Sequence, residues 1–131
     1  MSELKLPEVN RVTLSGRLTR DPEKRYASDG TEVTRFSLAF HRRFRSNAGQ
    51  WTEHTGYVQV VCYQRLAEVC AKYLRTGSPV LVEGRLQMRE WTTERNEKRT
   101  SLELRAESVH FLEKAPGGEE PTVSASEDPT S

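Results

Sequence analysis

Residues 80–91, VLVEGRLQMREW, constrain the fold of this chain more than any other stretch. One alternating set of side chains is apolar or small, and it consists of Val80, Val82, Gly84, Leu86 and Met88. After Leu81 and Glu83 the other set is basic and aromatic, running through Arg85, Gln87, Arg89 and Trp91. Successive side chains of a strand point to opposite faces, so the pattern predicts a strand with one face in a core. A glycine inside a strand often marks a sharp bend, as at a barrel corner, and Gly84 lies on the core side.

The outward face of this stretch has two interpretations. It is an ordinary solvated sheet face with one exposed tryptophan, or it is a basic, aromatic platform of the kind that binds a single nucleic-acid strand. The stretch by itself favours neither interpretation.

Five other segments show apolar periodicity. Alternation at period two predicts four more strands, in residues 12–18, 33–44, 57–63 and 100–112. In the last of these the parity changes after Ala106, which indicates a bulge. Residues 64–74 instead carry an apolar stripe with helical spacing, made of Leu66, Val69, Cys70, Tyr73 and Leu74. We therefore expect a helix there, with Tyr73 in the core.

The order of these elements predicts the fold class. Five strands with one helix between the third and the fourth is the order of the OB-fold, an all-β, five-stranded barrel whose outer face binds oligonucleotides or oligosaccharides. We expect this barrel in residues 1–112. Residues 113–131 carry no apolar periodicity and are expected to form a disordered acidic tail.

The distribution of charge supports this division. Residues 1–112 carry 19 Lys and Arg against 14 Asp and Glu, whereas residues 113–131 carry one lysine against five acidic residues. A mildly basic body joined to an acidic tail is typical of a nucleic-acid-binding domain with a disordered extension.

Other classes of site have little support. Cys62 and Cys70 lie among apolar residues and are expected to be buried free thiols, and the three histidines show no ligand spacing, so we expect no metal site. We find no nucleophile–base pair and no Gly-rich phosphate loop, and we expect no catalytic residues and no cofactor. The N-terminus lacks the apolar core of a signal peptide and no run is long enough to span a membrane, so we expect a cytoplasmic, nucleoid-associated protein.

Several stretches resemble bacterial single-stranded DNA-binding proteins. The most specific are GRLTRDPEKRY, RLAEVCAKYLRTGS and VEGRLQMREW, and the resemblance covers residues 8–112. It implies an OB-fold homotetramer that binds single-stranded DNA without sequence preference during replication, recombination and repair, without a cofactor and without catalysis. It also implies base stacking on aromatic rings at four places, which in this sequence are Phe44, Tyr57, Tyr63 and Trp91.

The sequence departs from the family pattern at several positions. Phe44 and Tyr57 stand where tryptophan is usual, Tyr63 where phenylalanine is usual, and Val58 where histidine is usual near a subunit contact. A regular strand would give Phe44 core parity, whereas the resemblance, or a bulge, would place it outside. The terminal SASEDPTS lacks the usual final phenylalanine, so recruitment of replication and repair proteins through the tail tip is in doubt.

The candidate nucleic-acid-binding set combines these rings with nearby polar side chains. It consists of Trp91, Tyr57, Tyr63, Phe44, Trp51, Arg17, Arg35, Arg42, Arg43, Arg45, Arg85, Gln87 and Arg89. Trp51, in a polar loop over residues 45–53, is interpreted equally well as a local packing anchor. Outward Leu81 and Val61 leave apolar surface for assembly. The alternatives are a primosomal OB-fold protein, a specialised paralogue that binds single-stranded nucleic acid, and a protein-interaction domain, which would lack salt-sensitive DNA binding.

Overall fold

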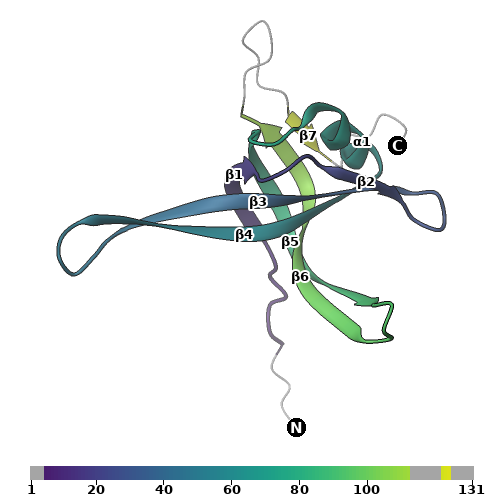
Figure 1. The fold of residues 1–131 in the computed structure, drawn as a ribbon, viewed down its shortest axis with the longest axis horizontal. Coiled ribbons are helices and arrows are strands. Elements are labelled where there is room, and N and C mark those ends of the chain that lie inside the picture. Colours follow the sequence, from purple (N-terminus) through teal and green to yellow (C-terminus); the bar gives the residue numbers. More distant parts are fainter. Residues whose placement is uncertain (1–4, 113–121, 125–131) are drawn as a thin grey trace, which may run out of the picture.

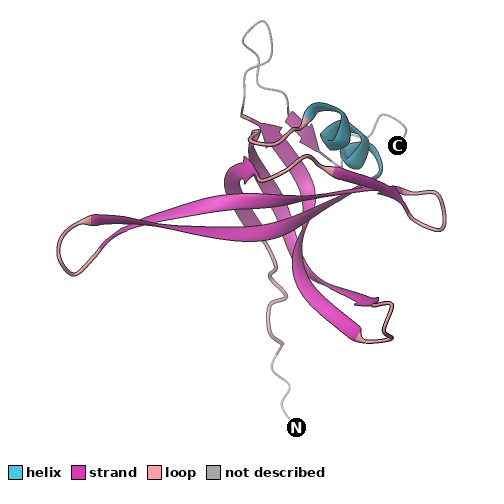
Figure 2. Cartoon of the chain, viewed as in Figure 1, coloured by secondary structure: helices cyan, strands magenta, loops and turns pink. Residues whose placement is uncertain are grey.

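The computed structural model describes residues 5–112 and 122–124 of the chain (Figure 1). Seven strands and one helix follow one another as β1 Val12–Leu18, β2 Glu23–Tyr26, β3 Glu32–Arg45, β4 Trp51–Tyr63, α1 Gln64–Tyr73, β5 Pro79–Thr92, β6 Lys98–Phe111 and β7 Thr122–Ser124. Strands dominate the described residues, and α1 sits at one end of the sheet (Figure 2). Within these residues no helix is long and apolar enough to cross a membrane.

Five of the strands close into a barrel. The sheet order runs β1-β5-β6-β4-β3, and a second pairing of β1 with β3 joins the two ends. β1 pairs with β5 from Val12↔Gly84 to Arg17↔Pro79, but with β3 only at Arg17↔Ala39 and Leu18↔Leu38. This is the five-stranded barrel with one helix expected from the sequence. β2 extends the sheet beyond β3, and β7 pairs with β6.

The apolar parity of the sequence accounts for the core. Alternate residues of the barrel strands point inward, and many are fully buried, among them Leu38, Val60, Val82 and Leu104. The helix closes one end of the barrel with Leu66, Ala67 and Cys70. It is tied to β3 because the Thr34 hydroxyl donates a hydrogen bond of 2.8 Å to the Ala67 carbonyl oxygen.

The bend in β5 depends on a glycine and a bulge. The register moves from Glu83↔Ser108 to Gly84↔Ala106, so that Glu107 is an extra residue in β6, as the parity change predicted. A Cβ atom on Gly84 would lie 2.0 Å from the Arg105 carbonyl oxygen. Only glycine lets the two backbones approach this closely.

Two hairpins continue past the barrel as free arms, one from β3 and β4 and one from β5 and β6 (Figure 1). On these arms the face with core parity no longer has a core beneath it. Met88 and Leu102, which the alternation placed on the inner face, pair directly with each other and are 59% and 53% exposed. The core prediction is wrong at these two positions because inward parity buries a side chain only while the strand belongs to the barrel.

The structure also differs from the sequence-based predictions at Tyr73, at Val61 and at strand β2. Tyr73 was expected in the core, but it is 60% exposed and the Lys72 ammonium lies 5.4 Å from its ring centroid. Val61 was expected outside, but it is fully buried because its register partners Arg35 and Arg105 flank it with long side chains. Strand β2 was not predicted.

The predicted disorder of residues 113–131 falls almost entirely outside the described residues. The exception is β7, which pairs antiparallel with β6 from Ser108↔Ser124 to His110↔Thr122. The two cysteines are buried free thiols, as expected, with their sulfur atoms 3.9 Å apart. Contact with the Cys70 thiol, together with burial, raises the pKa of the Cys62 thiol well above its usual range.

Candidate nucleic-acid interface

The outward faces of β5, β6, β4 and β3 form one continuous surface with a row of cations. The register places Arg85 opposite Arg105, Arg105 opposite Val61, and Val61 opposite Arg35. Arginines on β5, β6 and β3 therefore stand nearly abreast, with Val61 of β4 between the last two, as a surface for phosphate groups requires.

Two rings of the candidate set lie on this surface beside arginines. The Arg89 guanidinium lies 4.8 Å from the Trp91 ring centroid, and the Arg105 guanidinium lies 4.5 Å from that of Tyr63. Arg89 and Trp91 are two residues apart on β5 and share a face. Arg105 reaches Tyr63 diagonally across the parallel pairing of β6 with β4, since its direct partner is Val61. Each pair combines a cation with a ring, the two elements needed to hold a phosphate and a base.

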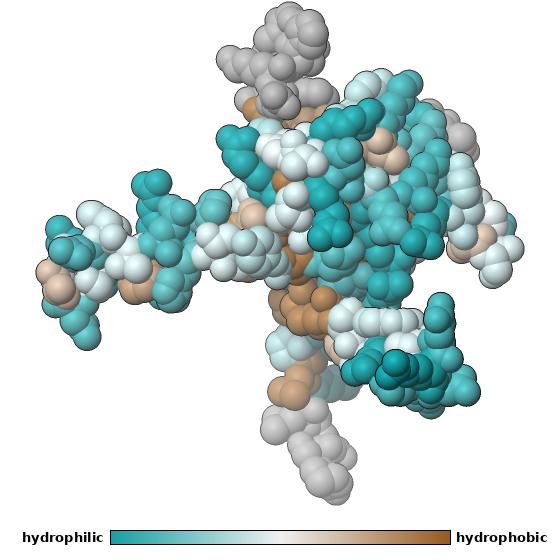
Figure 3. Space-filling view, in the orientation of Figure 1, coloured by the Kyte–Doolittle hydropathy of each residue, from teal (hydrophilic) through white to brown (hydrophobic). Residues whose placement is uncertain are grey.

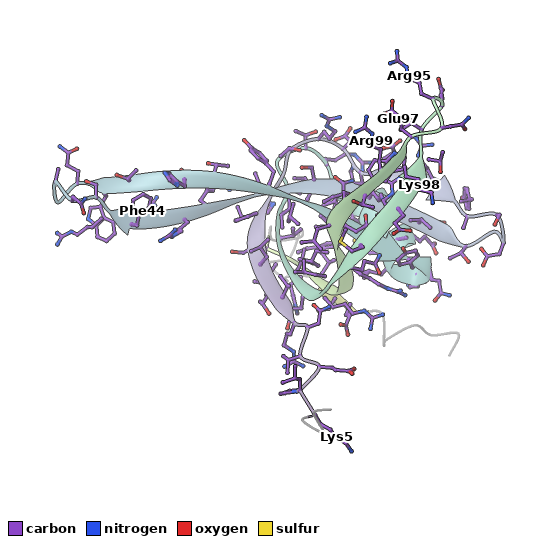
Figure 4. The ribbon with its side chains drawn as sticks, turned by 90° about the horizontal axis from the view of Figure 1, so that it is seen from below. Lys5, Phe44, Arg95, Glu97, Lys98 and Arg99 are labelled. Carbon is purple, nitrogen blue, oxygen red and sulfur yellow. The ribbon has the colours of Figure 1, made fainter. Side chains whose placement is uncertain are left out.

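The same combination recurs on the β3–β4 arm, where Figure 4 labels Phe44. The Arg42 guanidinium lies 5.2 Å from the Phe44 ring centroid, and the His54 ring meets Phe44 edge-on at 4.8 Å. The pairing of β3 with β4 is regular through Phe44↔Thr52, so Phe44 keeps core parity without a bulge. It is half-buried beyond the end of the core, so the structure follows parity and not the outward position that the resemblance implied.

Trp51 lies in strand β4 and not in a loop. It pairs directly with Arg45, whose guanidinium lies 5.5 Å from the indole centroid, and it is 69% exposed. Its exposure contradicts the interpretation as a buried packing anchor. Tyr57, on the same strand, is 67% exposed because its partner Ala39 is too small to cover the ring.

Several candidate polar residues already form ion pairs or hydrogen bonds within the protein. Arg43 forms an ion pair with Glu53 at 3.4 Å, and the Arg17 guanidinium donates to the Gly77 carbonyl oxygen at 2.8 Å. On the central surface a single carboxylate, Glu103, binds both Arg35 and Gln87. The structure thus divides most of the predicted cations into a group held by acceptors and a group beside rings, and Arg85 belongs to neither group.

A groove of about 300 Å³ joins the surface to the edge of the sheet. It is lined by Glu23, Arg25, Val33, Arg35, Gln59 and Arg89. A second hollow, of about 380 Å³, lies on the β3–β4 arm between Arg43 and Trp51. At the tip of the other arm, Figure 4 shows Arg95, Lys98 and Arg99 around Glu97.

Sequence reasoning missed Arg105 and Glu103. Their signal was present, since both have the outward parity of the last strand, opposite to Leu104 and Ala106. Among the described residues, no group of three or more His, Cys, Asp or Glu side chains could hold a metal ion.

Comparisons with known proteins point to one class. The model of the single-strand binding protein family matches residues 9–112. A Chlorobaculum tepidum protein named single-stranded DNA-binding protein 2 is 46% identical over 83% of this chain and 74% of its own length. A Thermotoga maritima single-stranded DNA-binding protein is 44% identical over 91% of this chain and 82% of its own. Among solved structures, Plasmodium falciparum SSB in complex with single-stranded DNA superposes with a TM-score of 0.67 and 28% identity, over 79% of this chain and 90% of that one.

Proposed function

This chain belongs to the single-strand binding protein family, and from that premise we propose that it binds single-stranded DNA without sequence preference through the outer face of β3 to β6. The observation that carries the proposal is the repeated pairing of an arginine with an aromatic ring, at Trp91, Tyr63 and Trp51 on this face and at Phe44 on the other face of the β3–β4 arm. Its role is to protect and organise single strands during replication, recombination and repair.

The chemistry of these pairs accounts for binding without sequence preference. Every base has a π-face, so stacking on a ring contributes about 1–3 kcal/mol per base whatever the sequence. The guanidinium beside each ring can pair with phosphate oxygens, and this contribution is equally independent of sequence. Nothing in this mechanism breaks or forms a covalent bond, so we assign the chain as a cofactor-free binding protein and not as an enzyme. We further propose that it acts in the cytoplasm.

The test is a fluorescence titration with oligo-dT at several salt concentrations. Five arginines stand beside rings or in the cation row without an acidic partner among the described contacts: Arg42, Arg45, Arg85, Arg89 and Arg105. If each neutralises one phosphate, log affinity should fall against log salt with a slope of about −3.5 per barrel, at about −0.7 per phosphate. A slope near zero would show that these arginines do not meet phosphate.

Assembly is the second expectation, and we propose a homotetramer. Figure 3 shows both arms mostly hydrophilic, whereas apolar surface gathers near the base of the N-terminal segment between the arms. Exposed Met88 and Leu102, with half-buried Leu81, add to the apolar area that association would cover. Light scattering at micromolar concentration should give four times the mass of the chain, and a monomer would contradict the proposal.

A further inference from the structure

A buried acid lies in the middle of the proposed DNA-binding face. Glu103, on β6, is 1% exposed although it has outward parity. An ionised carboxylate is costly to bury unless it is paired and hydrogen-bonded. Glu103 meets this condition through two strands at once: the Arg35 Nε of β3 lies 3.3 Å from Oε2, and the Gln87 amide of β5 donates to Oε1 at 3.0 Å.

This arrangement separates Arg35 from the other two arginines of the cation row. The Arg35 side chain is 22% exposed, so it stays at the surface, but its charge is offset by the carboxylate beneath it. Arg85 and Arg105, in contrast, stand opposite each other with outward parity. Without Glu103 the row would hold three uncompensated cations, on β5, β6 and β3.

We propose that Glu103 acts as an internal counter-ion, which withdraws Arg35 from the phosphate-binding set and so sets the salt dependence of DNA binding. The inference rests on the proposed function and names a positioning residue within the same face. Each phosphate that a protein neutralises releases condensed counterions, so the count of uncompensated cations fixes how steeply affinity falls with salt. Because Glu103 offsets its charge, Arg35 drops out of the count of uncompensated cations. The bound strand is therefore easier to release.

The central variant is Glu103→Gln, which keeps the shape and the acceptor oxygen but removes the charge. The uncompensated Arg35 then neutralises one more phosphate, so the slope of log affinity against log salt should become steeper by about 0.7. Between 50 and 200 mM salt this is an additional loss of about 2.5-fold in affinity. A purely structural role for Glu103 would lower the melting temperature without changing the slope measured on folded protein.

The double variant Arg35→Gln/Glu103→Gln supplies the second half of the test. Removing both charges leaves the net charge of the face unchanged, so its slope should return to that of the unsubstituted protein. Arg35→Gln alone is unsuitable because it strands a buried carboxylate. Arg85→Gln is the reference variant, and it should make the slope shallower by about 0.7.

Two results would overturn the inference. One is a Glu103→Gln protein whose slope equals that of the unsubstituted protein. The other is a double variant whose slope is shallower by as much as that of Arg85→Gln, since Arg35 would then meet phosphate in the natural protein. If Glu103→Gln does not fold, the slope of the double variant can still be compared with that of Arg85→Gln, and this comparison tests the inference. Failure of the proposed function looks different, because the unsubstituted protein itself would then show no salt-sensitive binding.

Discussion

Replacing Trp91 with alanine is expected to weaken binding of oligo-dT by about tenfold to a hundredfold and to leave the melting temperature nearly unchanged. The indole is 38% exposed on an arm that has no core beneath it, so its loss removes little packing. It is also the ring beside Arg89, and its loss removes the stacking energy of one base, about 1–3 kcal/mol. Quenching of tryptophan fluorescence on binding and differential scanning fluorimetry, both on the same protein, measure the two effects.

Matched variants separate stacking from packing. Trp91→Phe should lose less affinity than Trp91→Ala because a ring remains. Tyr73→Ala should lose none, since Tyr73 is an exposed ring with a lysine beside it on α1, outside the proposed face. If Trp91 were a core residue, its replacement by alanine would instead cost about 3–5 kcal/mol of stability. A large fall in melting temperature with unchanged affinity per folded molecule would therefore refute the stacking role.

The largest effect on stability is expected at the bend of β5. In Gly84→Ala the new methyl group would lie 2.0 Å from the Arg105 carbonyl oxygen and 2.9 Å from the carbonyl carbon, so backbone and not a flexible side chain must move. We expect a loss of about 3 kcal/mol in the free energy of unfolding, at the upper end of the range for overpacking. Urea denaturation monitored by circular dichroism measures it. Because Arg105 stands over Tyr63, DNA affinity of the folded fraction should fall as well.

Gly30→Ala is the control for Gly84→Ala. Gly30 has a φ of 89°, and nothing lies within 4 Å of an added Cβ, so its replacement costs only the left-handed backbone strain of about 1–2 kcal/mol. Crowding at Gly84 would be ruled out as the cause if Gly84→Ala cost less than Gly30→Ala.

Local patterns in the sequence predicted most of the barrel. Alternation identified the barrel strands, and the broken parity after Ala106 identified the bulge opposite Gly84. These signals succeed because a residue's neighbours along the strand determine which face it occupies. They do not reveal where a strand leaves the barrel, which is why Met88 and Leu102 were placed in the core.

The sequence predicted which types of residue make up the candidate site, but it did not predict which of them contact one another. Tyr57 and Trp91 are exposed, as their outward parity predicted, whereas the sequence had placed Trp51 in a loop and left its role open. That Arg35 is held by Glu103 depends on β3 and β6 lying on either side of β4, and no local pattern encodes this arrangement. The prediction for Tyr73 was wrong in the same way, since the helical spacing placed it on the apolar stripe but the structure buries Leu66, Ala67 and Cys70 of the helix and leaves Tyr73 exposed.

The position of β1 between β5 and β3 has a consequence for synthesis on the ribosome. β1 has only two register pairs with β3, and most of its partners lie in β5, which begins about 60 residues after β1 ends. At roughly 5–20 residues per second, this delay lasts on the order of 3–12 s. During that time β1 of the nascent chain, with Val12 and Leu14, lacks the strand with which it forms most of its pairs. Closure of the barrel is therefore expected only after β5 has been synthesised, late in cotranslational folding.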